Sequence, residues 1–112
     1  QIYSKNINFS KKINFLKNID KKANCVMWLF TILTPYKDIL QKKLRNFKIE
    51  SNQVHFRNDR YSIFKKYIKN KKFPNMQKLQ NQYLVLPMHT KMKISDAVKI
   101  SKTINYIINN TK

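Results

Sequence analysis

CVMWLFTILTPYKDILQKKLRNF, the segment from Cys25 to Phe47, decides the fold class of this chain. Its first part is a continuous apolar run with aromatic and β-branched residues, which predicts a buried, central strand over Val26 to Leu33. Thr34 is suited to cap a helix and Pro35 to occupy its first position, and apolar residues then recur at helical spacing. The segment therefore predicts a strand followed directly by a helix over Pro35 to Phe47.

The flanking sequence continues this alternation of strands and helices. KINFLK, upstream, predicts a short first strand, and IESNQVHF predicts a strand over Ile49 to Phe56. RYSIFKKYIKN then predicts a short helix with Tyr61, Phe64 and Ile68 on one side. FPNMQKLQNQ predicts a turn, with a helical turn as an option.

The last third of the chain supplies one more strand and one more helix. YLVLP predicts a buried strand over Tyr83 to Leu86, which Pro87 ends. A helix is expected over Ser95 to Asn109, with one apolar stripe. The fold class expected is α/β (α+β), a small, mainly antiparallel sheet with helices on one face. The stripe consists of Ala97, Ile100, Ile104, Ile107 and Ile108.

Composition excludes several kinds of site. The chain has no glycine, so it contains no P-loop, dinucleotide fingerprint or nucleophile elbow. A single cysteine, Cys25, rules out an internal disulfide, and no metal-ligand spacing occurs. No apolar run is long enough to span a bilayer, and the first residues lack the apolar core of a signal peptide. We therefore expect a soluble, cytoplasmic protein with no metal and no membrane partner.

The formal net charge of +19 leaves two interpretations open. Such a charge suits nucleic acid or an anionic surface, but lysine, asparagine and isoleucine are also over-supplied by AT-rich genomes, and lysines cover many surfaces without a partner. Two interpretations also remain for the segment YSIFKKYIKNKKF, which interleaves aromatic residues with lysines. It suits single-stranded nucleic acid, or a helix that buries its aromatic side. A small basic RNA-binding or ribosome-associated protein is thus one candidate function.

Scarcer polar residues gather in IESNQVHFRNDRYSIFKKY. His55 lies at the end of a predicted strand, and Arg57, Asn58 and Arg60 follow it, where a loop commonly presents groups to phosphates or sugars. The alternative is a polar turn in which Asn58 and Asp59 cap the next helix. A second histidine, in LPMH, is either a ligand-facing group or an ordinary loop residue.

Two stretches together carry a resemblance to a known family. They are CVMWLFTILTPYKDILQKKLRNFKIESNQVHFRNDRYSIFKKY and FPNMQKLQNQYLVLPMHTKMKISDAVKISKTI. In order and spacing they resemble the C-terminal part of the DegT/DnrJ/StrS family, pyridoxal-phosphate-dependent sugar aminotransferases that include perosamine synthases. The resemblance covers roughly residues 24 to 108 and rests on the series of motifs, since no single one is specific.

The resemblance implies a fold and an activity. Residues 24–112 would form the small C-terminal domain of a fold-type-I aminotransferase, and residues 1–23 a linker and first strand leading in from a large domain. The parent enzyme would transfer an amino group from glutamate to a 4-keto-6-deoxy nucleotide sugar and act as a homodimer. Its cofactor lysine, the acidic partner of the cofactor ring and the phosphate cup would lie on the large domain. No part of this chain matches those motifs, so we expect no catalytic or cofactor-binding residue here and an inactive isolated chain.

The resemblance also assigns the polar cluster to substrate. HFRND matches the histidine and RND of perosamine-synthase-like members, near cofactor and sugar nucleotide. Many relatives have proline in place of Asn58 and a second histidine in place of Arg60, which leaves the contact of Arg60 open. Pro87 and His89 match an element with a mainly structural role. The expected substrate-binding residues are His55, Arg57, Asn58 and Arg60.

One departure from the family concerns the end of the first predicted helix. Relatives usually have glycine before the isoleucine that starts the next strand, whereas here Lys48 precedes Ile49. A lysine in the left-handed conformation costs on the order of 1 kcal/mol relative to glycine. We therefore expect a rearranged turn in which Asn46 takes the left-handed position.

Overall fold

The computed structural model describes residues 2–15, 28–69 and 71–111 and shows an α/β chain with one small antiparallel sheet. The strand order is β1-β2-β3, and both pairings are antiparallel. This confirms the fold class expected from the sequence. In chain order the elements are α1 (Ile2–Asn6), β1 (Asn14–Phe15), β2 (Phe30–Leu33), α2 (Lys37–Asn46), the 3-10 turns η1 (Asn58–Arg60) and η2 (Ser62–Phe64), α3 (Lys65–Ile68), α4 (Pro74–Gln80), β3 (Tyr83–Leu86) and α5 (Ile94–Asn109).

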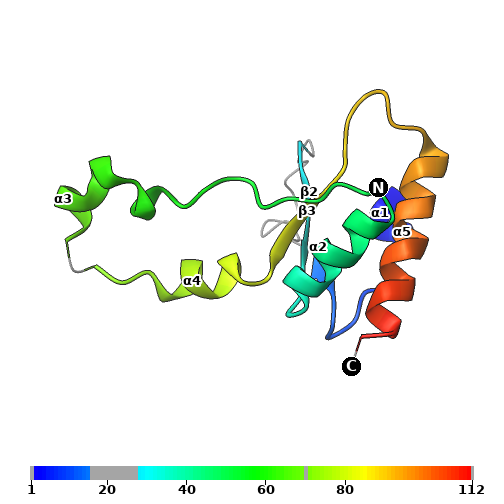
Figure 1. Ribbon diagram of the computed structural model, residues 1–112, viewed down its shortest axis with the longest axis horizontal. Helices are drawn as coiled ribbons and strands as arrows, with labels where there is room; N and C mark the ends of the chain where they lie inside the picture. Colours follow the sequence, from blue (N-terminus) through cyan, green and yellow to red (C-terminus); the bar gives the residue numbers. More distant parts are fainter. Residues whose placement is uncertain (1, 16–27, 70, 112) are drawn as a thin grey trace, which may run out of the picture.

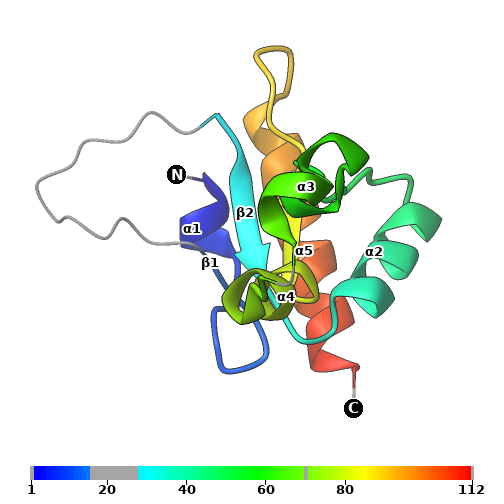
Figure 2. The same cartoon turned by 90° about the vertical axis from the view of Figure 1, so that its left-hand side faces the viewer.

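Helices cover one face of the sheet, and an arm projects from the other side. Figure 1 shows α1, α2 and α5 together beside the strands, with α3 and α4 on the opposite side. We call residues 54–82 the arm. It consists of two limbs joined at α3, and Figure 2 looks along it toward the sheet. None of its described residues is buried, so the arm lies outside the hydrophobic core.

The core lies between the sheet and the three helices. The predicted apolar stripe of α5 is confirmed, because all five of its residues are buried. β3 has the predicted bounds, and its last three residues are buried. The least exposed core side chains, at 0%, are Ile32 on β2, Leu40 and Leu44 on α2, Leu84 on β3 and Ile104 on α5.

The first described residues belong to this core as well. Tyr3 and Ile7 are buried, and burial raises the pKa of the Tyr3 phenol. The Tyr3 hydroxyl donates to the carbonyl of Pro87 at 2.7 Å. On α5, Asn105 accepts from the backbone N–H of Asn8 and donates to the carbonyl of Asn6, both at 2.8 Å. Side-chain hydrogen bonds therefore join α1 to the last helix.

The strand predicted over Val26 to Leu33 is shorter than expected. β2 begins at Phe30, and its burial alternates with a period of two. Trp28 precedes the strand and is exposed, so the prediction of a buried, tryptophan-centred strand is wrong at this residue. Cys25 and Val26 lie outside the described residues.

The strand predicted over Ile49 to Phe56 is wrong. Within it, only Asn52 pairs with the sheet, through an isolated antiparallel bridge to Val85. The side-chain amide of the next residue, Gln53, donates to the carbonyl of Gln80 in the arm. Pairing stops here because the backbone leaves the edge of β3 and enters the arm.

The short helix predicted over residues 60–70 is broken into η1, η2 and α3. Tyr61 and Phe64 are exposed, so the expected burial of this aromatic side is wrong. Apolar residues at helical spacing are buried only where another element packs against them. Among the described residues, no other helix or strand covers the side of the chain that carries Tyr61 and Phe64.

Both ends of α2 differ from the expectation. The helix begins at Lys37 with Tyr36 as its N-cap residue, and no side chain caps it. Thr34 instead lies buried one turn earlier, where its hydroxyl donates to the carbonyl of Lys12 at 2.7 Å and accepts from the N–H of Tyr36 at 3.2 Å. The predicted start at Pro35 is thus two residues early.

At the C-terminal end, Lys48 itself adopts the left-handed conformation, with φ of 58°. The N–H of Ile49 reaches the carbonyl of Leu44 at 3.0 Å, and that of Lys48 reaches the carbonyl of Arg45 at 2.9 Å, which is the Schellman pattern. Asn46 remains in the helix, so the expected rearrangement is wrong. Leu44 and Ile49, at the two ends of this motif, are both buried in the hydrophobic core, which favours the standard cap despite the lysine.

Replacing Lys48 by glycine is expected to raise the free energy of unfolding by about 1 kcal/mol, because glycine has no Cβ to clash at positive φ. Urea unfolding followed by circular dichroism measures the change. Lys42→Gly, at an exposed position inside the same helix, should lower the free energy by about 1 kcal/mol. Equal effects of the two substitutions would contradict this account of the cap.

Candidate functional site

A cleft of about 660 Å³ lies between the two limbs of the arm. Its size falls within the range of small-molecule sites. One wall comes from the limb that follows Gln53 and the other from α4 and the start of β3. The lining residues are Thr31, Val54, His55, Phe56, Arg57, Asn58, Tyr61, Met76, Leu79, Gln80 and Tyr83.

His55 and Asn58 both line the cleft and are exposed. The carbonyl of His55 accepts a hydrogen bond of 2.9 Å from the Tyr83 hydroxyl, which fixes this backbone to β3. The imidazole ring of His55 lies beside the indole ring of Trp28, tilted by 43°, with the ring centroids 5.7 Å apart. Asn58 opens η1, and no side chain caps this turn. The polar turn of the alternative interpretation is present, but Asn58 and Asp59 do not cap the following turns, whose N-cap residues are Tyr61 and Phe64.

Arg57 joins the two limbs of the arm. Its Nε and Nη2 donate to the two carboxylate oxygens of Asp59, at 2.8 and 2.6 Å. Its Nη1 donates to Oε1 of Gln77 at 2.8 Å and of Gln80 at 3.3 Å, both on α4. The Arg57 and Asp59 side chains are only 9% and 15% exposed. We call Arg57, Asp59, Gln77 and Gln80 the clasp.

The clasp shifts the ionisation of both charged members. Hydrogen bonding to Arg57 is the largest cause that lowers the pKa of the Asp59 carboxyl, and hydrogen bonding to Asp59 raises the pKa of Arg57. Both groups are charged at neutral pH, with every nitrogen of the guanidinium already donating. Of the five guanidinium N–H groups, four donate to these partners, so most of the hydrogen-bonding capacity of Arg57 is already used.

Arg60 lies apart from the other three predicted residues. It is exposed and does not line the cleft, and its Nη2 donates to Oε1 of Gln77 at 3.1 Å. The structure thus brings His55, Arg57 and Asn58 to one cleft. Arg60 lies outside this cleft and is hydrogen-bonded to the clasp through Gln77.

Sequence reasoning missed the second wall of the cleft. Met76 and Leu79 supply apolar surface, and Gln77 supplies the acceptor for both arginines. The available signal was Pro74 at the first helical position with Met76, Leu79 and Gln80 at helical spacing after it. On the opposite wall, the ring of Phe56 packs edge-on against that of Tyr61, with the ring centroids 5.1 Å apart. The two walls of the cleft are therefore largely aromatic and aliphatic.

His89 lies in a second, separate cleft of about 490 Å³, beside the start of α5. Pro87 also lines it, and its carbonyl anchors Tyr3, in keeping with a structural role. Both signs of charge line this cleft, from Glu50 and Asp96 to Lys48 and Lys91. Nothing in this arrangement selects a ligand.

Two kinds of site are not found in the part of the chain that the structure describes. No three histidine, cysteine, aspartate or glutamate side chains there gather closely enough to hold a metal ion. Among the same residues, no helix has the length and apolar character needed to cross a membrane.

Comparison with known proteins supports the resemblance seen in the sequence. A model of the DegT/DnrJ/EryC1/StrS aminotransferase family matches residues 1–105. The fold is similar to the crystal structure of the aminotransferase TlmJ from Streptoalloteichus hindustanus, with a TM-score of 0.82 at 11% sequence identity. The similarity covers 96% of this chain and 29% of TlmJ, so the chain spans less than a third of that structure. No curated protein sequence matches the chain.

Proposed function

Because the chain belongs to the DegT/DnrJ/EryC1/StrS aminotransferase family, we propose that it is the C-terminal part of an enzyme that transfers an amino group from glutamate to a 4-keto-6-deoxy nucleotide sugar. In this proposal the large domain, residues outside this chain, holds the cofactor, and the parent enzyme is a cytoplasmic homodimer. Residues 24–112 form the small domain. Residues 2–15 share its core, so they would act as more than a linker.

The cleft in the arm is the observation that carries this proposal. Its aromatic and aliphatic walls suit a nucleobase and the methyl group of a 6-deoxy sugar. Its polar edge, with His55 and Asn58, suits hydroxyl and phosphate oxygens. A nucleotide sugar combines these two kinds of surface in one ligand.

The contacts within the site divide the four predicted residues into different roles. His55 and Asn58 have exposed side chains at the cleft and would contact the nucleotide sugar directly. Arg57 would act mainly as a positioning residue, because four of its five guanidinium N–H groups already donate within the clasp. Arg60 donates a single hydrogen bond and is exposed, so it would supply charge to a diphosphate that extends past the clasp.

Pyridoxal phosphate does not fit the residues of this chain alone. The chain has no glycine with which to build a close-fitting phosphate cup, and no lysine among the described residues lines the cleft. The cofactor, which carries the amino group between glutamate and sugar, would thus be held by the large domain. The isolated chain is expected to show no transaminase activity.

Titration of the chain with nucleotide-linked hexoses, followed by calorimetry, tests the proposal. We expect saturable binding that Asn58→Ala and His55→Ala each weaken about 5- to 30-fold, as typical of lost side-chain hydrogen bonds. Asn75→Ala, on the exposed part of α4 outside the cleft, serves as the matched control and should leave affinity unchanged. Equal affinity for all three variants would contradict the assignment of the cleft. If the parent enzyme, with its large domain, transferred no amino group to such a sugar, the proposed reaction itself would be contradicted.

A further inference from the structure

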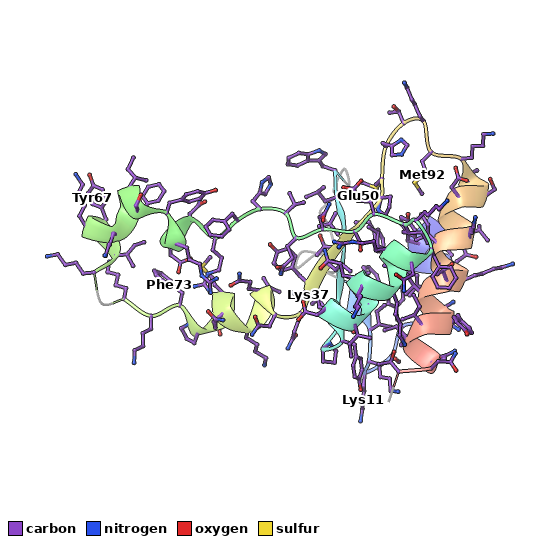
Figure 3. The ribbon with its side chains drawn as sticks, viewed as in Figure 1. Lys11, Lys37, Glu50, Tyr67, Phe73 and Met92 are labelled. Atoms are coloured by element: carbon purple, nitrogen blue, oxygen red, sulfur yellow. The ribbon has the colours of Figure 1, made fainter. Side chains whose placement is uncertain are left out.

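The tip of the arm, residues 60–69 and 71–72, carries apolar side chains that nothing covers among the described residues. Ile63, Phe64 and Tyr67 are all exposed, and Figure 3 shows Tyr67 at the far end of the arm. Ile63 and Phe64 end the turn η2, and Tyr67 lies in α3, which follows directly, so the three side chains come from adjoining turns of the chain. None of the three lines the cleft. The packing explanation for this aromatic pattern therefore fails at the tip.

Positive charge surrounds these side chains. Six basic residues and no acidic residue occur between positions 60 and 72, and all six are exposed. Asp59, the nearest acid in the sequence, is held by Arg57. Lys66 lies with its Nζ 4.9 Å from the centre of the Tyr67 ring, which places charge and aromatic face together. The six are Arg60, Lys65, Lys66, Lys69, Lys71 and Lys72.

We propose that the tip of the arm binds single-stranded nucleic acid, with Phe64 and Tyr67 stacking on bases and the lysines contacting phosphates. Bases of a single strand are free to stack on an exposed ring, whereas those of a duplex are covered by their neighbours. A protein partner fits less well, because lysine is depleted at the centre of protein interfaces. This site does not depend on the proposed amino transfer, since its side chains lie outside the cleft.

Fluorescence anisotropy with a short labelled single-stranded RNA tests this site on the whole chain. Tyr67→Ala and Phe64→Ala are each expected to weaken binding about 5- to 100-fold at fixed salt, and to leave the salt dependence unchanged because no charge is lost. Lys65→Gln with Lys66→Gln should instead reduce the slope of affinity against salt between about 50 and 200 mM. All four side chains are exposed, so the variants should remain folded.

Matched controls lie on α5. Tyr106 is 63% exposed, against 66% for Tyr67, and Tyr106→Ala should leave RNA affinity unchanged. Lys99→Gln with Lys102→Gln removes the same charge from exposed positions elsewhere and should affect the salt slope less.

Several results would overturn the proposal. Equal effects of Tyr67→Ala and Tyr106→Ala would mean that net charge alone drives binding, and equally tight binding of duplex RNA or heparin would mean the same. If poly-glutamate binds as tightly as RNA and depends equally on Tyr67, the tip recognises an acidic protein surface instead. Absence of saturable RNA binding at low salt would also refute it.

Discussion

Replacing Ile104 by alanine is expected to lower the free energy of unfolding by about 2 to 5 kcal/mol, a large fraction of the stability of a small domain. Ile104 is 0% exposed and lies on α5, inside the single core shared by the sheet and helices. The substitution removes three buried carbons and leaves a cavity that close-packed neighbours fill only in part. Urea unfolding at 25 °C measures the loss.

The same helix offers a control for this prediction. Ile94 is 70% exposed at the first position of α5, and Ile94→Ala should change the free energy of unfolding by no more than about 0.5 kcal/mol. Similar destabilisation by the two substitutions would mean that helix propensity, rather than core packing, determines the contribution of α5.

Replacing Arg57 by alanine is expected to open the arm while leaving the core folded. Arg57 makes two hydrogen bonds that join the limbs and Arg60 adds one, and no described residue of the arm is buried to replace them. Hydrogen exchange of the α4 amides should become on the order of 10-fold faster or more, whereas exchange in α5 should stay unchanged. Nucleotide-sugar affinity should fall together with the protection of α4.

Arg57→Lys separates positioning from simple charge. A lysine keeps the positive charge but cannot donate from several nitrogens in the planar fork that reaches Asp59, Gln77 and Gln80. We expect it to restore little of the α4 protection. Full rescue by lysine would contradict the clasp and favour a direct charge contact with ligand.

The clasp also implies a direction of pH dependence. Asp59 has a lowered pKa in the folded arm, so its pairing with Arg57, which holds the guanidinium that reaches α4, stabilises the clasp above the ordinary carboxyl pKa of 3.8. This stabilisation is lost as pH falls below that value and Asp59 becomes protonated. We therefore expect hydrogen exchange of the α4 amides to become faster at low pH in the wild-type protein. The Arg57→Ala variant, which lacks this contact, should show no such change.

The elements best predicted from the sequence are those specified by local signals. β3 was predicted with its observed bounds because an apolar run ends at Pro87, which cannot continue the sheet. The α5 stripe was predicted residue for residue because its period matches a helix with one buried face. In both cases neighbouring residues in the sequence determine the structure.

The missed features depend on contacts between distant residues. IESNQVHF has the composition of a strand, yet only Asn52 pairs, since the next residue bonds to Gln80 and the chain turns away. The clasp likewise unites Arg57 with Gln77, 20 residues later, and no sequence period reveals such a pair. Family resemblance pointed to the polar cluster, but the division of its residues between cleft and clasp required the fold.

The contact between α1 and α5 has a consequence during synthesis on the ribosome. A hydrogen bond joins Asn6 to Asn105, residues 99 positions apart, and Tyr3 and Ile7 share the core with the last helix. Translation proceeds at about 5 to 20 residues per second, so this first segment waits roughly 5 to 20 s before its partner exists. During that time its apolar side chains are available to chaperones, and the core is completed only after the last helix has emerged.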